Sequence, residues 1–154
     1  MTPAEYVLEL GTCVGITTRY LSQVTKGSLW TIEGAEALWE IAKSDPIPQK
    51  TEFVLGEISK MLPPLLSQIP KLDFVLIDAN HTYDGTLGSF ESCLKKIHSK
   101  SLIIIGDIHW SKEMELAWQT IKNHPSVKLT FVFFVCGVLF FDYPGSKNHL
   151  ILDI

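Results

Sequence analysis

Two groups of polar side chains stand directly after apolar runs of this sequence. The first begins at Asp78 and includes His81, and the second begins at Asp107 and includes His109. Carboxylates and imidazoles are the side chains that bind cations and transfer protons in enzymes. A charged edge at the ends of buried strands is costly unless it has a function or good partners. We therefore expect a site where the two groups meet.

Three interpretations of this polar edge stay open. In the first, Asp78, Asp107 and a histidine bind a divalent cation that holds a substrate hydroxyl as its oxyanion. In the second, His81 or His109 is a general base that removes the hydroxyl proton directly. In the third, the two aspartates cap the helices that follow them, and the histidines bond to loop carbonyls.

A glycine-containing turn follows the first apolar run, Tyr6–Leu10. Gly11 permits a sharp turn there, and Gly15 permits the next helix to pack close to the strand. Ligands of such folds lie outside the carboxyl ends of the strands. A dinucleotide site requires the spacing GxGxxG, whereas Cys13 holds the middle position here. This departure disfavours a nucleotide-dependent oxidoreductase, which is the rival function on the same fold.

Two glutamates follow the next two apolar runs. Glu33 stands 18 residues after Gly15, at the tip of the second predicted strand. A carboxylate there can accept hydrogen bonds from both hydroxyls of a ribose, although it could equally cap the next helix. Glu57 follows the third run and is placed to contact an adenine edge. Its alternative is an ordinary acid in the first turn of a helix, favoured by the helix dipole.

The segment VLELGTCVGITTRYLS resembles motif I of the class I S-adenosylmethionine-dependent methyltransferases. The resemblance implies that Glu9 is the motif's acidic residue, that the acid and loop serve the methionine end of the cofactor, and that Glu33 holds the ribose. The acceptor implied is a hydroxyl on a small molecule. The predicted cofactor-binding residues are Glu9, Gly11, Thr12, Cys13, Gly15, Glu33, Gly34, Glu57 and Asp78.

The two polar groups lie in segments similar to small bacterial methyltransferases, and more distantly to catechol and caffeoyl-coenzyme-A O-methyltransferases. Those enzymes bind a metal through an aspartate after the fourth strand and an acidic or Asp-Asn pair after the fifth. Asp78 matches the first position and Asp107 the second residue of the pair, but Gly106 replaces the other acid. We therefore expect weak or no tight divalent binding, and we expect Gly106→Asp to strengthen it. The predicted catalytic residues are His81, His109 and Asp107.

Alternating apolar runs and helical patterns must position these residues. The alternation predicts βαβ units and a parallel sheet with helices on both faces. The predicted strands are Tyr6–Leu10, Ser28–Ile32, Thr51–Leu55, Leu72–Ile77, Leu102–Ile105, Val127–Val135 and Val138–Phe141, with an extra edge strand at His149–Ile154. The predicted helices are Thr17–Thr25, Ala35–Ser44, Ile58–Gln68, Thr86–Ile97 and Lys112–Asn123. Pro63 and Pro64 are expected to break or kink the third helix.

The fold class expected is α/β, a Rossmann-like doubly wound sheet. The resemblance implies seven strands, mostly parallel, with Gly137 at the turn into an antiparallel last strand. The length of 154 residues fits a single domain. Because the first strand begins at Tyr6, we expect this domain to lack the N-terminal helices of its relatives. A cofactor-binding core without turnover is therefore the alternative to an active enzyme.

The composition of the sequence limits the kinds of partner and the cellular location that we expect for this protein. The formal net charge of −4 argues against a nucleic-acid-binding surface. The three cysteines show no CxxC spacing, which favours a reducing cytoplasm. The most hydrophobic run, Phe131–Phe141, is too short to span a membrane as a helix. Because this run is unusually apolar for a sheet edge, we expect a homodimer that buries it, the alternative being cover by the C-terminal strand.

Overall fold

The computed structural model describes residues 4–44, 46–47 and 50–152. Eight strands form one sheet in the order β3-β2-β1-β4-β5-β7-β6-β8. The strands are β1 (Tyr6–Leu10), β2 (Ser28–Glu33), β3 (Thr51–Leu55), β4 (Leu72–Ile77), β5 (Ile97–Ile105), β6 (Leu129–Phe133), β7 (Cys136–Phe140) and β8 (Asn148–Ile151). The helices are α1 (Ile16–Val24), α2 (Glu36–Ser44), α3 (Ile58–Gln68), α4 (Tyr83–Leu94) and α5 (Lys112–Asn123).

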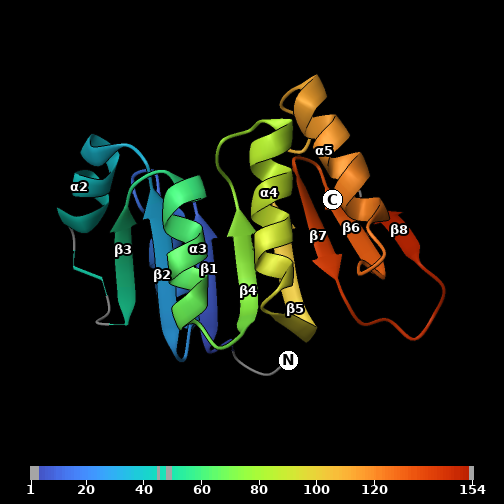
Figure 1. Ribbon diagram of the computed structural model, residues 1–154, viewed down its shortest axis with the longest axis horizontal. Helices are drawn as coiled ribbons and strands as arrows, with labels where there is room; N and C mark the ends of the chain where they lie inside the picture. The colour runs from blue at the N-terminus through green and yellow to red at the C-terminus, as the bar shows by residue number, and fades with distance from the viewer. Residues whose placement is uncertain (1–3, 45, 48–49, 153–154) are drawn as a thin grey trace.

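Strand pairing confirms the predicted doubly wound α/β fold. Within the described chain, every pair of neighbouring strands is parallel except β5–β7 and β6–β7. The order in which strands are added to the sheet reverses between β1 and β4, because β2 and β3 lie on one side of β1 and all later strands lie on the other. Figure 1 shows α3, α4 and α5 along the near face of the sheet. The crevice at this reversal is where ligands bind in such sheets.

The sheet has eight strands, so the expected count of seven is wrong. The additional strand is β8, which pairs in parallel with β6. The predicted extra strand therefore exists, and the part of it at residues 153–154 lies outside the described residues. Since β7 lies between β5 and β6, and β8 covers β6, the expectation that β6 and β7 form an open edge is also wrong. The alternative, cover by the C-terminal strand, is confirmed.

Gly137 does not lie at the turn into β7, where it was expected. It is a paired residue of β7, opposite Ile105 and Val132. The turn falls instead at Phe134, which has a φ of 41° and is 89% exposed. Gly137 is required for a packing reason, because a β-carbon there would overlap the indole ring of Trp118 on α5.

Two helices differ from their predicted form. Helix α4 begins at Tyr83 rather than Thr86, because the Thr82 side chain accepts a hydrogen bond from the Gly85 amide and caps the first turn. It ends at Leu94, so that Ile97 begins β5 and pairs with Leu72. Helix α3 runs unbroken through its two prolines. Its leucines Leu62, Leu65 and Leu66 are buried, and this packing outweighs the missing backbone hydrogen bonds.

Helix α5 has the predicted bounds and buries Met114 and Trp118 in the core. Trp110 precedes the helix and is 74% exposed. The core lies between the sheet and its helices and is built from the apolar residues of β1, β4 and β5 with Leu62, Phe90 and Met114. No helix among the described residues is long and apolar enough to cross a membrane.

Candidate functional site

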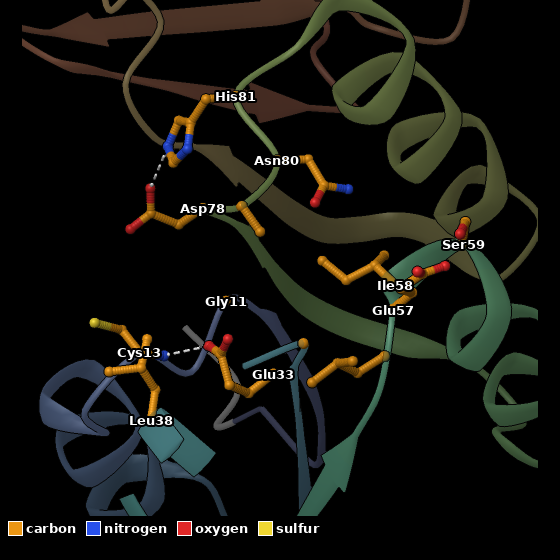
Figure 2. Close-up of a pocket in the computed structure, with 13 residues that line it drawn as sticks. Gly11, Cys13, Glu33, Leu38, Glu57, Ile58, Ser59, Asp78, Asn80 and His81 are labelled. Carbon is orange, nitrogen blue, oxygen red and sulfur yellow. Dashed lines mark hydrogen bonds and ion pairs between the residues drawn. The ribbon is translucent and has the colours of Figure 1, made fainter. Parts of the chain in front are cut away.

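A cleft of about 550 Å³ opens at the carboxyl ends of β1, β2, β3 and β4. Its lining comes from the four segments that follow these strands, and Figure 2 shows their side chains around it. The lining residues are Gly11, Cys13, Ile32, Glu33, Gly34, Leu38, Glu57, Ile58, Ser59, Asp78, Ala79, Asn80 and His81. The structure therefore brings together Gly11, Cys13, Glu33, Gly34, Glu57 and Asp78 of the predicted cofactor residues, with the predicted catalytic residue His81.

Glu33 ends β2 and is half-buried at the base of this cleft. One carboxylate oxygen accepts a hydrogen bond from the Cys13 amide, and the other accepts one from the Ala35 amide, each at 2.8 Å. The first contact is drawn in Figure 2. These two bonds hold the carboxylate in a single orientation. Each oxygen keeps a further lone pair for a ligand, because an ionised carboxylate offers about four acceptor sites.

The turn after β1 is forced close to β4. Gly11 has a φ of 101°, and a β-carbon on it would overlap the backbone carbonyl of Asp78. Cys13 also adopts a left-handed backbone, with a φ of 49°, and its side chain is exposed. Its amide is thereby directed at Glu33. The loop is thus shaped by one glycine and by one residue strained for a ligand-facing position.

Gly15 serves a different contact from the one expected. It caps α1 with a φ of 80°, and a β-carbon on it would press against Ala42 of α2 at 3.1 Å. The glycine therefore permits close packing of α1 on α2 rather than of α1 on a strand. Gly15 and Thr12 do not line the cleft, and Thr12 is buried beneath it.

Glu9 lies on β1, below the loop, and is 0% exposed. One carboxylate oxygen accepts hydrogen bonds from the hydroxyls of Thr18 (2.5 Å) and Thr31 (2.6 Å). The other oxygen is buried without a hydrogen-bond partner among the described residues. Burial raises the pKa of Glu9 to about 6, against the lowering effect of the two hydroxyls. Glu9 thus supports the loop from below and does not line the cleft.

Asp78, His81 and Asp107 form a cluster at the ends of β4 and β5. The Nε2 atom of His81 lies 3.1 Å from an oxygen of Asp107 and 3.5 Å from an oxygen of Asp78. This atom is buried and has no aligned hydrogen bond within the described structure. His81 and Asp107 both have positive φ angles, 41° and 50°. Such strain in two adjacent polar loops is typical of functional sites.

The cluster also offers one ligand atom from each residue, all within 4.8 Å of one another. Two carboxylates and an imidazole suit a divalent cation, so this donor set fits a metal with three protein ligands. A β-carbon at position 106 would overlap the carboxylate of Asp78, so Gly106→Asp can add a ligand only if that carboxylate moves. The carboxylate of Asp78 occupies the space that a side chain at position 106 would need.

His109 is not part of this cluster. Its Nδ1 atom lies 4.0 Å from Glu115, and its ring lines two surface pockets beside α5. The Trp110 amide donates to the Asp107 carbonyl and closes a tight turn, in which the Trp110 ring lies 6.2 Å from the ring of His81. Of the predicted catalytic residues, the structure brings together His81 and Asp107 only.

Several residues of the cleft are not among those predicted from the sequence. Leu38 lies in the first turns of α2, and Ile58 and Ser59 begin α3. Together with Ile32 they make one wall of the cleft largely apolar. Their only signal in the sequence is their place in the first turns of helices that follow parallel strands, which face the ligand in this fold.

The methyltransferase domain family matches residues 8–108, which is more than half of the chain. The chain therefore belongs to this family. No curated protein matches the chain.

Three solved structures share the fold. The O-methyltransferase from Bacillus cereus in complex with SAH has a TM-score of 0.75 at 21% identity, over 90% of this chain and 74% of that one. The O-methyltransferase TomG from Streptomyces achromogenes, involved in tomaymycin synthesis and in complex with SAM, has a TM-score of 0.75 at 19% identity, over 91% and 74%. Cofactor-bound Rv0187 from MTB has a TM-score of 0.78 at 20% identity, over 90% and 73%.

Proposed function

We propose that this protein transfers a methyl group from S-adenosylmethionine to a hydroxyl of a small molecule. The observation that carries the proposal is Glu33, fixed at the base of a cleft at the carboxyl ends of β1 and β2. A carboxylate there accepts hydrogen bonds from both ribose hydroxyls. Membership in the methyltransferase domain family and the SAM- and SAH-bound relatives support this choice of cofactor.

The cleft offers a suitable place for each part of the cofactor. The apolar wall of Ile32, Leu38 and Ile58 suits the faces of an adenine ring, and Glu57 and Ser59 lie at the same end. The loop at Gly11 and Cys13 lies next to β4 and suits the methionine part. The sulfonium methyl would then lie near Asp78 and His81, where an acceptor can approach from the open side of the cleft.

His81 supplies the proton acceptor in this proposal. Its Nε2 atom faces the carboxylates of Asp78 and Asp107, which favours the tautomer with the proton on Nε2. The Nδ1 atom then keeps a lone pair for the acceptor's hydroxyl proton. Bound S-adenosylmethionine would supply an electrophilic methyl group and leave as the thioether, and His81 would accept the proton of the acceptor hydroxyl. The protein orients the reactants and excludes water.

Binding a divalent cation is the alternative role of the same cluster. Asp78, His81 and Asp107 would hold it, and it would supply a positive charge that stabilises the deprotonated acceptor. Asp78 and Asp107 are needed on either route, because they orient His81 in one case and act as ligands in the other. The two routes differ in their response to a chelator.

Calorimetric titration with S-adenosylhomocysteine tests the proposed function, with NAD as the comparison ligand. We expect one S-adenosylhomocysteine molecule per chain and no binding of NAD. The absence of S-adenosylhomocysteine binding, or tighter binding of NAD, would refute the proposal. Tight cofactor binding without methylation of any catechol or other hydroxyl compound would instead support the cofactor-binding core without turnover.

We also infer a cytoplasmic location and a homodimer. The location is supported by the three cysteines, which are all unpaired. Because β8 covers β6, the proposed dimer would pair through the outer strand β8 instead of β6 and β7. The four residues of β8 are all exposed, and its Ile151 is 76% exposed. An exposed outer strand with apolar side chains is a template for pairing with a second chain.

A further inference from the structure

The end of β2 holds the cofactor loop through three consecutive residues. The Thr31 hydroxyl lies 2.5 Å from the Thr12 hydroxyl. The Ile32 carbonyl accepts a hydrogen bond from the Thr12 amide at 3.3 Å. The Glu33 carboxylate accepts one from the Cys13 amide at 2.8 Å. A side chain, a backbone group and a second side chain therefore fasten the same short loop.

The hydroxyl contact has a defined direction. Thr31 carries a single hydroxyl proton, which it donates to the carboxylate of Glu9. The bond between Thr12 and Thr31 must then use the proton of Thr12. The result is a directed chain, in which Thr12 donates to Thr31 and Thr31 donates to Glu9. All three side chains are buried, so water does not compete for these bonds.

The three attachments differ in what a ligand does to them. Glu33 is the residue that the ribose engages in the proposed function, so its bond to Cys13 must be shared with the ribose hydroxyls. The hydrogen bonds that link Thr12, Thr31 and Glu9 lie beneath the cleft and are not accessible to a ligand. They are therefore the attachment that cofactor binding leaves intact.

We propose that Thr31 is a positioning residue for cofactor binding: through Thr12 it fastens the loop to the buried Glu9 when the ribose engages Glu33. This inference rests on the proposed function. Its distinctive consequence is that removing the hydrogen bond between Thr12 and Thr31 weakens cofactor binding, whereas removing another hydrogen-bond donor to Glu9 does not.

The experiment compares three valine variants by calorimetric titration with S-adenosylhomocysteine. Thr12→Val and Thr31→Val both remove the hydrogen bond between the two hydroxyls. Thr18→Val is the matched control, because it also removes a hydroxyl donor to Glu9 but leaves the hydrogen bonds of the loop in place. We expect about tenfold weaker binding for the first two and unchanged binding for the control, consistent with the loss of one hydrogen bond in a charged network. Thr31→Ser, which keeps the hydroxyl, should restore wild-type affinity.

Hydrogen exchange of the Cys13 amide, measured by NMR without ligand, provides a second test. Thr12→Val should exchange faster at this amide than wild type, while the core amides of β4 keep their protection. Wild-type affinity in Thr12→Val, or equal weakening by Thr18→Val, would overturn the inference. If the wild-type protein binds no S-adenosylhomocysteine, the proposed function fails, and unchanged exchange at Cys13 in Thr12→Val would then overturn the inference independently.

Discussion

The buried charge of Glu9 should make the stability of this protein fall as pH rises. The pKa of Glu9 is raised from 4.5 to about 6, with burial as the largest cause. Between these two values the folded state binds more protons than the unfolded state. The stability contributed by the neutral carboxyl is therefore fully present below pH 4.5 and is lost as pH rises through 6.

The size of this effect follows from the shift. About 1.5 pKa units at 1.36 kcal/mol per unit is roughly 2 kcal/mol of unfolding free energy. Glu9→Gln keeps an oxygen that accepts from Thr18 and Thr31 but does not titrate. The free energy of unfolding of Glu9→Gln minus that of wild type should therefore rise by about 2 kcal/mol between pH 4 and pH 7.

Urea unfolding followed by circular dichroism at pH 4, 5, 6 and 7 measures this difference. The pH dependence is the informative quantity, because any constant cost of the amide cancels. Glu91→Gln, at an exposed position of α4, is the matched control for removal of one negative charge. A difference between Glu9→Gln and wild type that is flat across this range would refute the reasoning. A difference that falls with pH would mean that the ionised carboxylate stabilises the fold.

Four further predictions concern the site and the assembly. Glu33→Ala should weaken S-adenosylhomocysteine binding by about 1–3 kcal/mol, measured by calorimetry; an unchanged dissociation constant would remove Glu33 from the site. His81→Gln should lower kcat by about 10²–10⁴, the range for loss of a general base, whereas His109→Gln should change it little; equal losses in steady-state assays would contradict the assignment. Calorimetry with Mg²⁺ should show no tight binding, because one of the three available ligands is the imidazole of His81, which suits a transition metal better than Mg²⁺; loss of activity with a chelator that Mg²⁺ restores would show the opposite. Light scattering at micromolar concentration should give the mass of a dimer, and a clean monomer would end that proposal.

The sheet and the cofactor end of the cleft could be predicted because their signals are local. Gly11 was expected at a sharp turn and has a φ of 101° there. Glu33 was expected at the tip of the second strand and lies at the base of the cleft. Both depend on the position of a residue relative to the end of one apolar run, and hydrophobic periodicity shows that position directly.

The features that could not be predicted depend on contacts between distant residues. Gly137 looked like a turn residue, but its role is set by Trp118, which no local pattern connects to it. His81 and His109 each follow an aspartate at a strand end, yet only His81 points into the cluster. The direction of a side chain after a strand depends on the φ angles of the loop, and the left-handed angles at His81 and Asp107 have no signal in the residue types.

The contact between Gly137 and Trp118 also fixes the position of α5 along the sheet. The indole of Trp118 occupies the space that a side chain on β7 would fill. Helix α5 can therefore neither slide nor rotate on the sheet without bringing a neighbouring β7 side chain under the ring. The sizes of the two residues are consequently coupled. A larger residue at position 137 is compatible with this packing only when position 118 carries a smaller one, so the two positions should change together or not at all.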